Sequence, residues 1–478
     1  MTRLPRWAAW LDAIAIILLV VAAKAALSGA VRLALPVDIS IASPWRPALL
    51  ALVLLVFRHW RAPAPTLPQR VAHGAALWRR EPQAFVFRVW VASRVGVLLV
   101  ALFAVLIIGT PPNADTRVSY DPIRDLPARW DAFWYAGIAR EGYSYDPRVG
   151  ASGQQTIAFF PAYPMLLRAA DLLTYPRRTL DMTLARHYEL RDSRLMWAGT
   201  FLSMACFLAA LLVLYQWVAR KHGVDAAAAA VVFTAAYPFA VFYSAAYTEG
   251  LFLLAAIVAC SAFERERWLA AAVAGLVAGL TRPNGAMLSL TLGVLAITPV
   301  VARAEQARRS LPRLLPAVAV AAMPGVGMLL YSAFIYSLTG DGFAWVSVQQ
   351  AWGRSLGETM SFFEVMWNTV RSEGVAQYVR IAPIGILQGA AALFALVMTW
   401  PVWRRLGAAY GVFMLANLLP PLLRGGVLSM GRMTSTLFPM FAALAMVVPA
   451  ERRPLWVLSF ALGQGLIATL FYTWRAVY

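Results

Sequence analysis

The sequence has little charge, and it has almost no cysteine, histidine or lysine. Only 14% of its 478 residues are charged, against about 25% in a typical soluble protein. Long uncharged runs alternate with short arginine-rich clusters, which argues against one large soluble core. Only two of the 42 basic residues are lysine, a bias that fits a GC-rich bacterial genome.

The scarcity of cysteine and histidine also limits the chemistry. Both cysteines, Cys206 and Cys260, lie within apolar runs and indicate neither a disulfide nor a metal framework. The histidines are scattered along the chain, at positions 59, 73, 187 and 222. We therefore expect no bound metal and no other cofactor.

Apolar residues are what the sequence has in abundance. They make up 61% of the chain, and the mean hydropathy is +0.64. Some apolar runs, such as 46–60 and 267–281, are shorter than the roughly 20 residues of a straight membrane span. Short spans are tolerated where a helix breaks over a cavity lined by protein. The pattern predicts an all-α polytopic membrane protein with a bundle of about 11–13 transmembrane helices.

The net charge of +19 is distributed unevenly. Most of the excess lies in short connectors on one side of the expected spans, which is typical of cytoplasmic loops. This location argues against nucleic-acid binding, because no basic run with interleaved aromatics leaves the membrane. Two long loops, about 110–194 and 339–380, have nearly balanced charge. They are predicted to face the periplasm or cell exterior, with the protein in the inner (plasma) membrane.

The same pattern predicts three regions. Residues 1–109 hold N-terminal spans and a basic cytoplasmic loop, and residues 110–194 form the first long outer loop. Residues 195–478 form a transmembrane bundle that contains the second outer loop. The apolar run from Leu11 to Ala23 lacks a convincing cleavage site, so it is interpreted as a retained signal anchor.

The first outer loop contains RWDAFWYAGIAREGYSYDP, residues 129–147. Trp130, Phe133 and Trp134 share one face at helical spacing, which predicts a short amphipathic helix at the membrane interface. Asp131 then lies near the helix N-terminus, where the helix dipole favours a carboxylate. From local sequence alone, Asp131 is either a functional carboxylate or only a helix cap. Farther along, the two prolines of PAYP predict a bend into a second interfacial helix.

Glu249 lies at the outer end between two apolar runs, in the segment YTEGLF. A carboxylate beside an apolar span is costly unless it is solvated or paired, which makes Glu249 a functional candidate. The alternative is a structural role in the first turn of a helix, next to Thr248.

Two arginines lie on the outer side, where the positive-inside pattern does not explain them. Arg282 stands in TRPNG, at a Pro-Gly helix break, and Arg432 stands in SMGRMTST. An anionic ligand would account for both positions. Together with the carboxylates of the aromatic outer loop, they suit a site for an anionic lipid headgroup.

These segments, in this order and spacing, resemble the PIG-V family of mannosyltransferases. The resemblance covers about 120–445 and rests on RWDAFWYAGIAREGY, AFFPAYPML, YTEGLF, TRPNG and SMGRMTSTLFPMF. The family belongs to the GT-C superfamily, and in eukaryotes PIG-V adds the second mannose of the GPI anchor. The chain departs from the family in its apolar runs before the WD segment. In a bacterial setting the GPI acceptor does not transfer with the family.

The resemblance implies a GT-C-like fold and a membrane hexosyltransferase. The hexose, mannose in this family, passes from a polyprenyl-phosphate donor to a lipid, glycan or protein acceptor on the periplasmic face, with inversion. It also implies that Asp131 is the general base, since a carboxylate can take the proton of the attacking hydroxyl. Arg282 and Arg432 would stabilise the leaving phosphate, and Glu249 would act as a second acid or bind the acceptor.

We also expect five residues to line the substrate site: Trp130, Tyr135, Phe160, Tyr163 and Asn284. Two alternatives stay open. One is a transporter or flippase of lipid-linked sugars, which shares an aromatic, arginine-lined cavity. The other is a GT-C transferase with a different sugar or acceptor. The long outer loop with its carboxylate favours an enzyme, because transport does not require it.

Overall fold

The structure is a computed structural model that describes residues 5–28, 31–34, 38–41, 43–63, 81–111, 117–150, 153–174, 184–301, 304–475 and 477. Within these ranges the chain is helical apart from one short antiparallel ribbon, β1 (Val31–Ala34) and β2 (Asp38–Ile41). The prediction of an all-α protein is confirmed, with this ribbon as a small exception.

Five helical segments of the described chain are long and apolar enough to cross a membrane. They are Glu81–Ile108, Glu189–Ala236, Leu314–Thr339, Pro383–Leu406 and Ala450–Tyr472. A bent pair, Pro238–Ser244 with Glu249–Phe263, makes a sixth if it counts as one span, and the bend between its halves is 101°. Four further apolar helices are shorter: Trp7–Ala23, Trp268–Thr281, Pro283–Thr298 and Phe438–Val447. These helices confirm a polytopic membrane protein, but many of the expected spans are short or broken.

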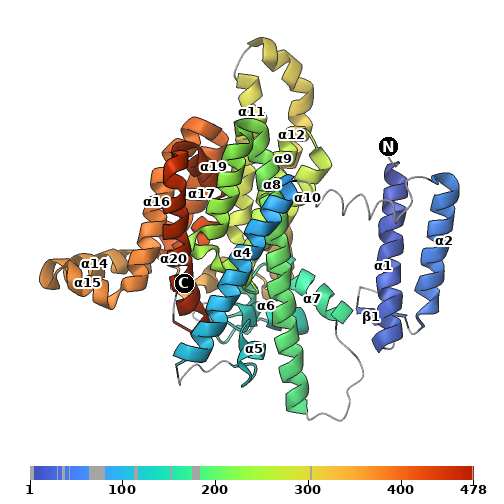
Figure 1. The fold of residues 1–478 in the computed structure, drawn as a ribbon, viewed down its shortest axis with the longest axis horizontal. Coiled ribbons are helices and arrows are strands. Elements are labelled where there is room, and N and C mark those ends of the chain that lie inside the picture. The colour runs from blue at the N-terminus through green and yellow to red at the C-terminus, as the bar shows by residue number, and fades with distance from the viewer. Residues whose placement is uncertain are drawn as a thin grey trace.

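The first two helices form a hairpin that stands beside the main bundle (Figure 1). They are α1 (Arg6–Ser28) and α2 (Trp45–Arg61). Arg58 of α2 and Asp12 of α1 form a buried ion pair, with 3.0 Å between Nε and Oδ1. Removing one partner of such a pair leaves an uncompensated buried charge, so the pair fixes how the two helices face each other.

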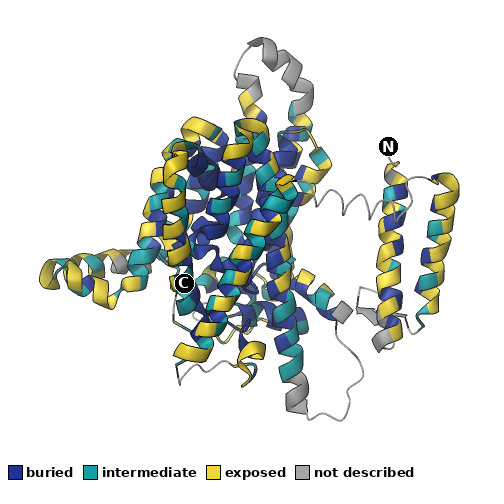
Figure 2. Ribbon diagram, in the orientation of Figure 1, coloured by how far each residue is buried: buried dark blue, intermediate teal, exposed yellow. Residues whose placement is uncertain are grey.

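The main bundle is assembled from helices that are distant in sequence. Its first half comprises α4 (Glu81–Phe103), the π-turn η1 (Ala104–Ile108), α8 (Leu184–Ala236), η4 (Pro238–Ser244), α9 (Glu249–Phe263), α10 (Trp268–Thr281), η5 (Pro283–Met287), α11 (Leu288–Val301) and α12 (Ala304–Thr339). Its second half comprises α16 (Pro383–Leu406), α17 (Ala408–Gly425), α18 (Met430–Ser435), α19 (Phe438–Val447), η7 (Ala450–Arg452) and α20 (Arg453–Tyr472). Buried residues fill the centre, and exposed ones face outward (Figure 2).

Small residues let some of these helices approach closely. A Cβ atom added to Gly279 of α10 would lie 1.9 Å from the backbone oxygen of Pro324 in α12. Only glycine therefore fits at this crossing, as is common between helices in membranes.

The elements of the first long loop, 110–194, gather at one end of the bundle (Figure 1). They are α5 (Pro122–Asp125), α6 (Ala132–Glu141), η3 (Thr156–Ala158) and α7 (Ala162–Thr174). The predicted helix after Trp130 and the helix entered through PAYP are both present. The second loop holds α13 (Ala344–Ser347), η6 (Val348–Trp352), α14 (Leu356–Glu373) and α15 (Val375–Ile381), and its α14–α15 pair projects sideways.

A buried arginine fastens the first loop to the bundle. The Arg129 side chain donates to the backbone oxygen of Tyr472, at 2.8 Å, and to the Asp125 carboxylate, at 2.9 Å. Tyr472 ends α20, so this contact joins the start of the WD segment to the last helix of the chain. Asp131, two residues later, is thereby held at the end of the bundle.

Candidate active site

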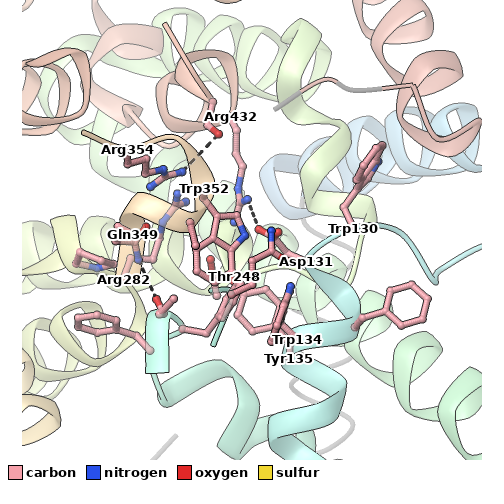
Figure 3. Close-up of a pocket in the computed structure, with 18 of the residues that line it drawn as sticks. Trp130, Asp131, Trp134, Tyr135, Thr248, Arg282, Gln349, Trp352, Arg354 and Arg432 are labelled. Carbon is pink, nitrogen blue, oxygen red and sulfur yellow. Dashed lines mark hydrogen bonds and ion pairs between the residues drawn. The ribbon is translucent and has the colours of Figure 1, made fainter. Parts of the chain in front are cut away.

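A cavity of about 650 Å³ opens between the two long loops, 110–194 and 339–380, and the end of the bundle. Its lining side chains come from α6 and the residues before it, from the segment around η3, from the starts of α9 and η5, from η6, and from α18. Figure 3 shows these side chains converging from segments that are far apart in sequence.

Asp131 lies in the cavity wall at the N-cap position of α6. Its side chain makes no capping hydrogen bond to the helix. Instead its Oδ2 accepts from Nη1 of Arg432 at 2.5 Å (Figure 3). The Asp131 side chain is 23% exposed. The interpretation of Asp131 as only a helix cap is therefore wrong, because its carboxylate faces an arginine and the cavity.

Glu249 is fully buried at the start of α9, beneath the cavity. Its Oε1 accepts from Nη1 of Arg282 at 2.8 Å and also from Nε of Arg432. A buried carboxylate is expensive unless it is paired, and these two guanidinium groups supply the pairing. Glu249 positions the arginines, and Asp131 is the carboxylate with access to the cavity.

Arg432 links the two carboxylates. It reaches Glu249 through Nε and Asp131 through Nη1, over 183 and 301 positions of sequence. Its guanidinium carbon also lies 4.6 Å from the ring centre of Tyr247, a cation–π contact. The Tyr247 hydroxyl in turn accepts from the backbone N–H of Asp131 at 3.1 Å. Arg432 and Tyr247 together fix the position of the WD segment.

Arg354 is a third cavity arginine, and the sequence analysis missed it. It follows Gly353, which adopts a left-handed conformation with φ of 69°, and thereby turns from η6 into the cavity. Its Nη2 donates to Oγ of Ser429 at 3.4 Å. Among the described residues no carboxylate pairs with it. Burial and the nearby charge of Arg432 lower the pKa of Arg354 to about 10. The same reasoning that singled out Arg282 and Arg432 applied to Arg354 as well, because it lies in a loop that the charge pattern predicted to face outward.

Aromatic rings form much of the remaining wall. Trp134 stacks on Phe159, with ring centres 5.5 Å apart, and Trp352 meets both rings edge-on. Trp130 has a positive φ of 51°, which is unusual for a bulky residue, and its ring packs against Trp474. Strain of this kind persists only where the surroundings hold it, and it is common at functional sites.

The five residues expected to line the substrate site divide into two groups. Trp130, Tyr135 and Phe160 line the cavity. Burial raises the pKa of Tyr135 to about 12, so its phenol stays protonated. Tyr163 and Asn284 are not among the lining residues. Tyr163 donates to the backbone oxygen of Gly199, and Asn284 donates to Asn417, so both hold helices together around the site.

A family model described as mannosyltransferase (PIG-V) matches residues 119–336. The matched segment is a little less than half of the chain, and over it the sequence is similar to this family. The match includes Asp131, Glu249 and Arg282 and stops before Arg354 and Arg432. With the apolar helices of the bundle, this match supports a membrane glycosyltransferase and confirms the resemblance found in the sequence.

No curated protein sequence matches the chain. Similar solved structures include the oligosaccharyltransferase of Archaeoglobus fulgidus. Its complex with Zn and sulfate is 16% identical with a TM-score of 0.36, and 79% of this chain aligns with 53% of that one. A form tethered to an acceptor peptide is 13% identical with a TM-score of 0.38, and 80% of this chain aligns with 55% of that one. The chain thus spans about half the length of these structures, and the likeness is distant.

Proposed function

We propose that the protein transfers a mannose from a polyprenyl-phosphate donor to an acceptor hydroxyl, with inversion at the anomeric carbon. One observation carries this proposal. The Asp131 carboxylate opens onto a cavity that also receives three arginines, Arg282, Arg354 and Arg432. A base beside a concentration of positive charge suits an acceptor that must lose a proton and a donor that leaves as a phosphate.

Asp131 is the proposed general base. As the acceptor oxygen attacks the anomeric carbon, its proton passes to the Asp131 carboxylate. The bond between that carbon and the phosphate oxygen breaks, and its electron pair leaves with the lipid phosphate. Glu249 is fully buried and bound to two arginines, so it is poorly placed to form a covalent sugar intermediate. A single displacement inverts the configuration of the carbon.

The arginines are proposed to bind the donor phosphate. Arg282 and Arg432 share the charge of Glu249, whereas Arg354 has no carboxylate partner in the described chain. The three arginines with Asp131 and Glu249 leave one net positive charge (3 − 2 = +1). A phosphate therefore finds a site with excess positive charge, and its guanidinium partners can bind it through paired hydrogen bonds.

The ion pair between Asp131 and Arg432 favours binding of the donor first. While Arg432 holds the carboxylate, Oδ2 of Asp131 is occupied by this ion pair and is not free to receive the proton of the acceptor. A donor phosphate competes for the same guanidinium and frees the carboxylate for the acceptor. Binding of the donor before the acceptor follows because Asp131 and the donor phosphate both bind Arg432.

The remaining parts of the proposal concern the fold, the membrane orientation, the acceptor and the metal requirement. The fold is proposed to be GT-C-like, with the cavity facing the periplasm or cell exterior of an inner (plasma) membrane. The acceptor is a lipid, glycan or protein hydroxyl. The arginines supply the positive charge, so we propose that no metal takes part. Unchanged turnover after treatment with EDTA is the expected result, and loss restored by a divalent ion would contradict it.

The decisive experiment uses the full chain in lipid with labelled polyprenyl-phosphate mannose and a panel of acceptors. We expect a glycosidic product whose anomeric configuration, determined by NMR, is opposite to that of the donor. Retained configuration would disprove the single displacement. Movement of intact labelled donor across the membrane without a new glycosidic bond would favour a flippase instead.

A further inference from the structure

Two cavities meet at the far end of α9 from the candidate active site. Glu249 begins α9 beneath the active-site cavity, and Arg265 follows its last turn, after about 22 Å of helix. One cavity, of about 320 Å³, lies between α4 and α8. The other, of about 590 Å³, lies among α8 to α12. Arg220 and Arg265 line both cavities, so they stand where the two meet.

The larger cavity is also lined by Lys221, Glu264 and Glu266 beside these arginines, and away from this charged end much of each cavity wall is apolar. Val86 and Leu212 line the smaller cavity, and Phe263, Leu295 and Leu314 line the larger one. These residues belong to the apolar helices of the bundle or adjoin them. In a membrane protein such walls are suited to hydrocarbon chains, whereas the arginines at the junction are not.

The two arginines lack anionic partners. Arg220 donates to the Ser261 hydroxyl at 2.9 Å, and neither it nor Arg265 forms an ion pair with any described residue. The neighbouring Lys221 differs, because it pairs with Glu264. Partial desolvation and the positive charges of Arg267 and Arg220 lower the pKa of Arg265. An anion between the two guanidinium groups would relieve this repulsion.

We propose that the paired cavities form a single site for an anionic glycerophospholipid with two acyl chains. Its phosphate lies between Arg220 and Arg265, and one acyl chain occupies each cavity. Basic pockets between transmembrane helices bind anionic lipid headgroups in this way. A lipid with a single polyprenyl chain would leave one cavity without an occupant, which is why the geometry points to two chains. The bound lipid would join α4 and α8 to α9 and α12.

The test measures lipid binding to the purified full chain in a neutral detergent by native mass spectrometry. The probes are dioleoyl-phosphatidylglycerol, dioleoyl-phosphatidylcholine and undecaprenyl phosphate. We expect phosphatidylglycerol to bind most tightly. The double variant Arg220→Gln with Arg265→Gln should weaken its binding roughly 30-fold, since each basic residue near a lipid surface contributes about fivefold. Binding of phosphatidylcholine should not change.

The matched control removes the same charge from the same end of the bundle. Arg267 and Arg453 are not among the residues that line the two cavities, and Arg453 pairs with Asp225. Arg267→Gln with Arg453→Gln should keep the preference for phosphatidylglycerol. Equal binding of the two glycerophospholipids by the wild type would overturn the proposal. Equal losses in both double variants, or tighter binding of undecaprenyl phosphate, would also overturn it.

A second measurement does not depend on the variants folding. Because a ligand of the native state raises its stability, phosphatidylglycerol should raise the thermal midpoint of the wild type more than phosphatidylcholine does. Equal midpoints at saturating lipid would contradict the site.

Discussion

Helix α9 has a glutamate at each end, and the two are held in different ways. Glu249, at the first residue of the helix, is fully buried and bound by two arginines. Glu264, directly after the last residue, accepts from Nε1 of Trp217 at 2.9 Å and from the hydroxyl of Tyr410 at 2.5 Å. Its cationic partner is Lys221.

The difference separates the candidate active site from a set of structural contacts between helices. Arg432, one of the two arginines that bind Glu249, also binds Asp131, which faces a cavity. A third arginine, Arg354, lines the same cavity and has no carboxylate partner in the part of the chain that the structure describes. At Glu264 two of the three donors are neutral, and the contacts tie α8 and α17 to the end of α9. At the Glu249 end, positive charge beyond what the two carboxylates neutralise borders the active-site cavity, and this excess is the feature that distinguishes it.

The largest expected effect follows from changing Asp131 to Asn. The amide keeps the shape of the side chain but cannot take the proton from the hydroxyl of the acceptor substrate. General-base catalysis contributes about 10²–10⁴-fold, so kcat should fall by that amount with little change in donor affinity. Steady-state kinetics in lipid measure both. Asp146→Asn, in the same loop but outside the cavity lining, is the control and should retain its activity. A folded Asp131→Asn enzyme with the wild-type rate would end the assignment.

Arg354 should give the second largest effect. Replacing it by Gln removes the cavity arginine that has no carboxylate partner, and turnover should fall about 10²-fold, as when one preorganised donor is lost from an oxyanion site. Arg354→Lys keeps the charge but not the planar fork, and should recover only part of the loss. Arg371→Gln, an exposed change on α14 in the same outer loop, should leave turnover unchanged. Equal turnover for all three variants would remove Arg354 from the phosphate site.

The sequence predicted local structure at the site well. The aromatic spacing after Trp130 predicted α6, and the prolines of PAYP predicted the turn into α7. The Pro-Gly break at Arg282 is present as a short 3₁₀ helix between α10 and α11. These features depend on residues that are close in sequence. The spacing of apolar residues and the backbone preferences of proline and glycine are therefore enough to predict them.

Contacts between distant segments could not be predicted in the same way. The sequence placed Arg432 and Asp131 on the same outer face, but nothing in it specifies that they touch across 301 positions. Local breaks behave differently. The basic pair Arg220 and Lys221 lies next to Gly223, whose non-helical backbone (φ of 87°, ψ of 167°) divides Leu184–Ala236 into two helices. This charge cluster therefore coincides with a break between helices.

A third prediction compares stability at the buried end of α9. Glu249→Gln leaves Arg282 and Arg432 without their shared carboxylate, and breaking a buried pair costs about 3–5 kcal/mol. The free energy of unfolding of the purified variant, measured in detergent, should be lower than that of the wild type by this amount. The double variant Glu249→Gln with Arg282→Gln should recover part of it, because one unpaired charge is removed as well. No loss in the single variant would mean that Glu249 does not support the arginines.

The smallest effect is expected at the other end of the same helix. Glu264→Gln keeps one oxygen, which can accept from Nε1 of Trp217, and its NH2 group can donate to the Tyr410 hydroxyl, so the main loss is the charge opposite Lys221. The Lys221 side chain is 35% exposed and remains hydrated, so the free energy of unfolding should fall by only about 1 kcal/mol. Activity should stay at the wild-type level, because no residue of this network lines the active-site cavity. The same unfolding and kinetic assays used for Glu249→Gln measure both quantities. A loss of turnover in Glu264→Gln without a loss of stability would show that the two ends of α9 are coupled. The contacts of Glu264 would then also contribute to catalysis.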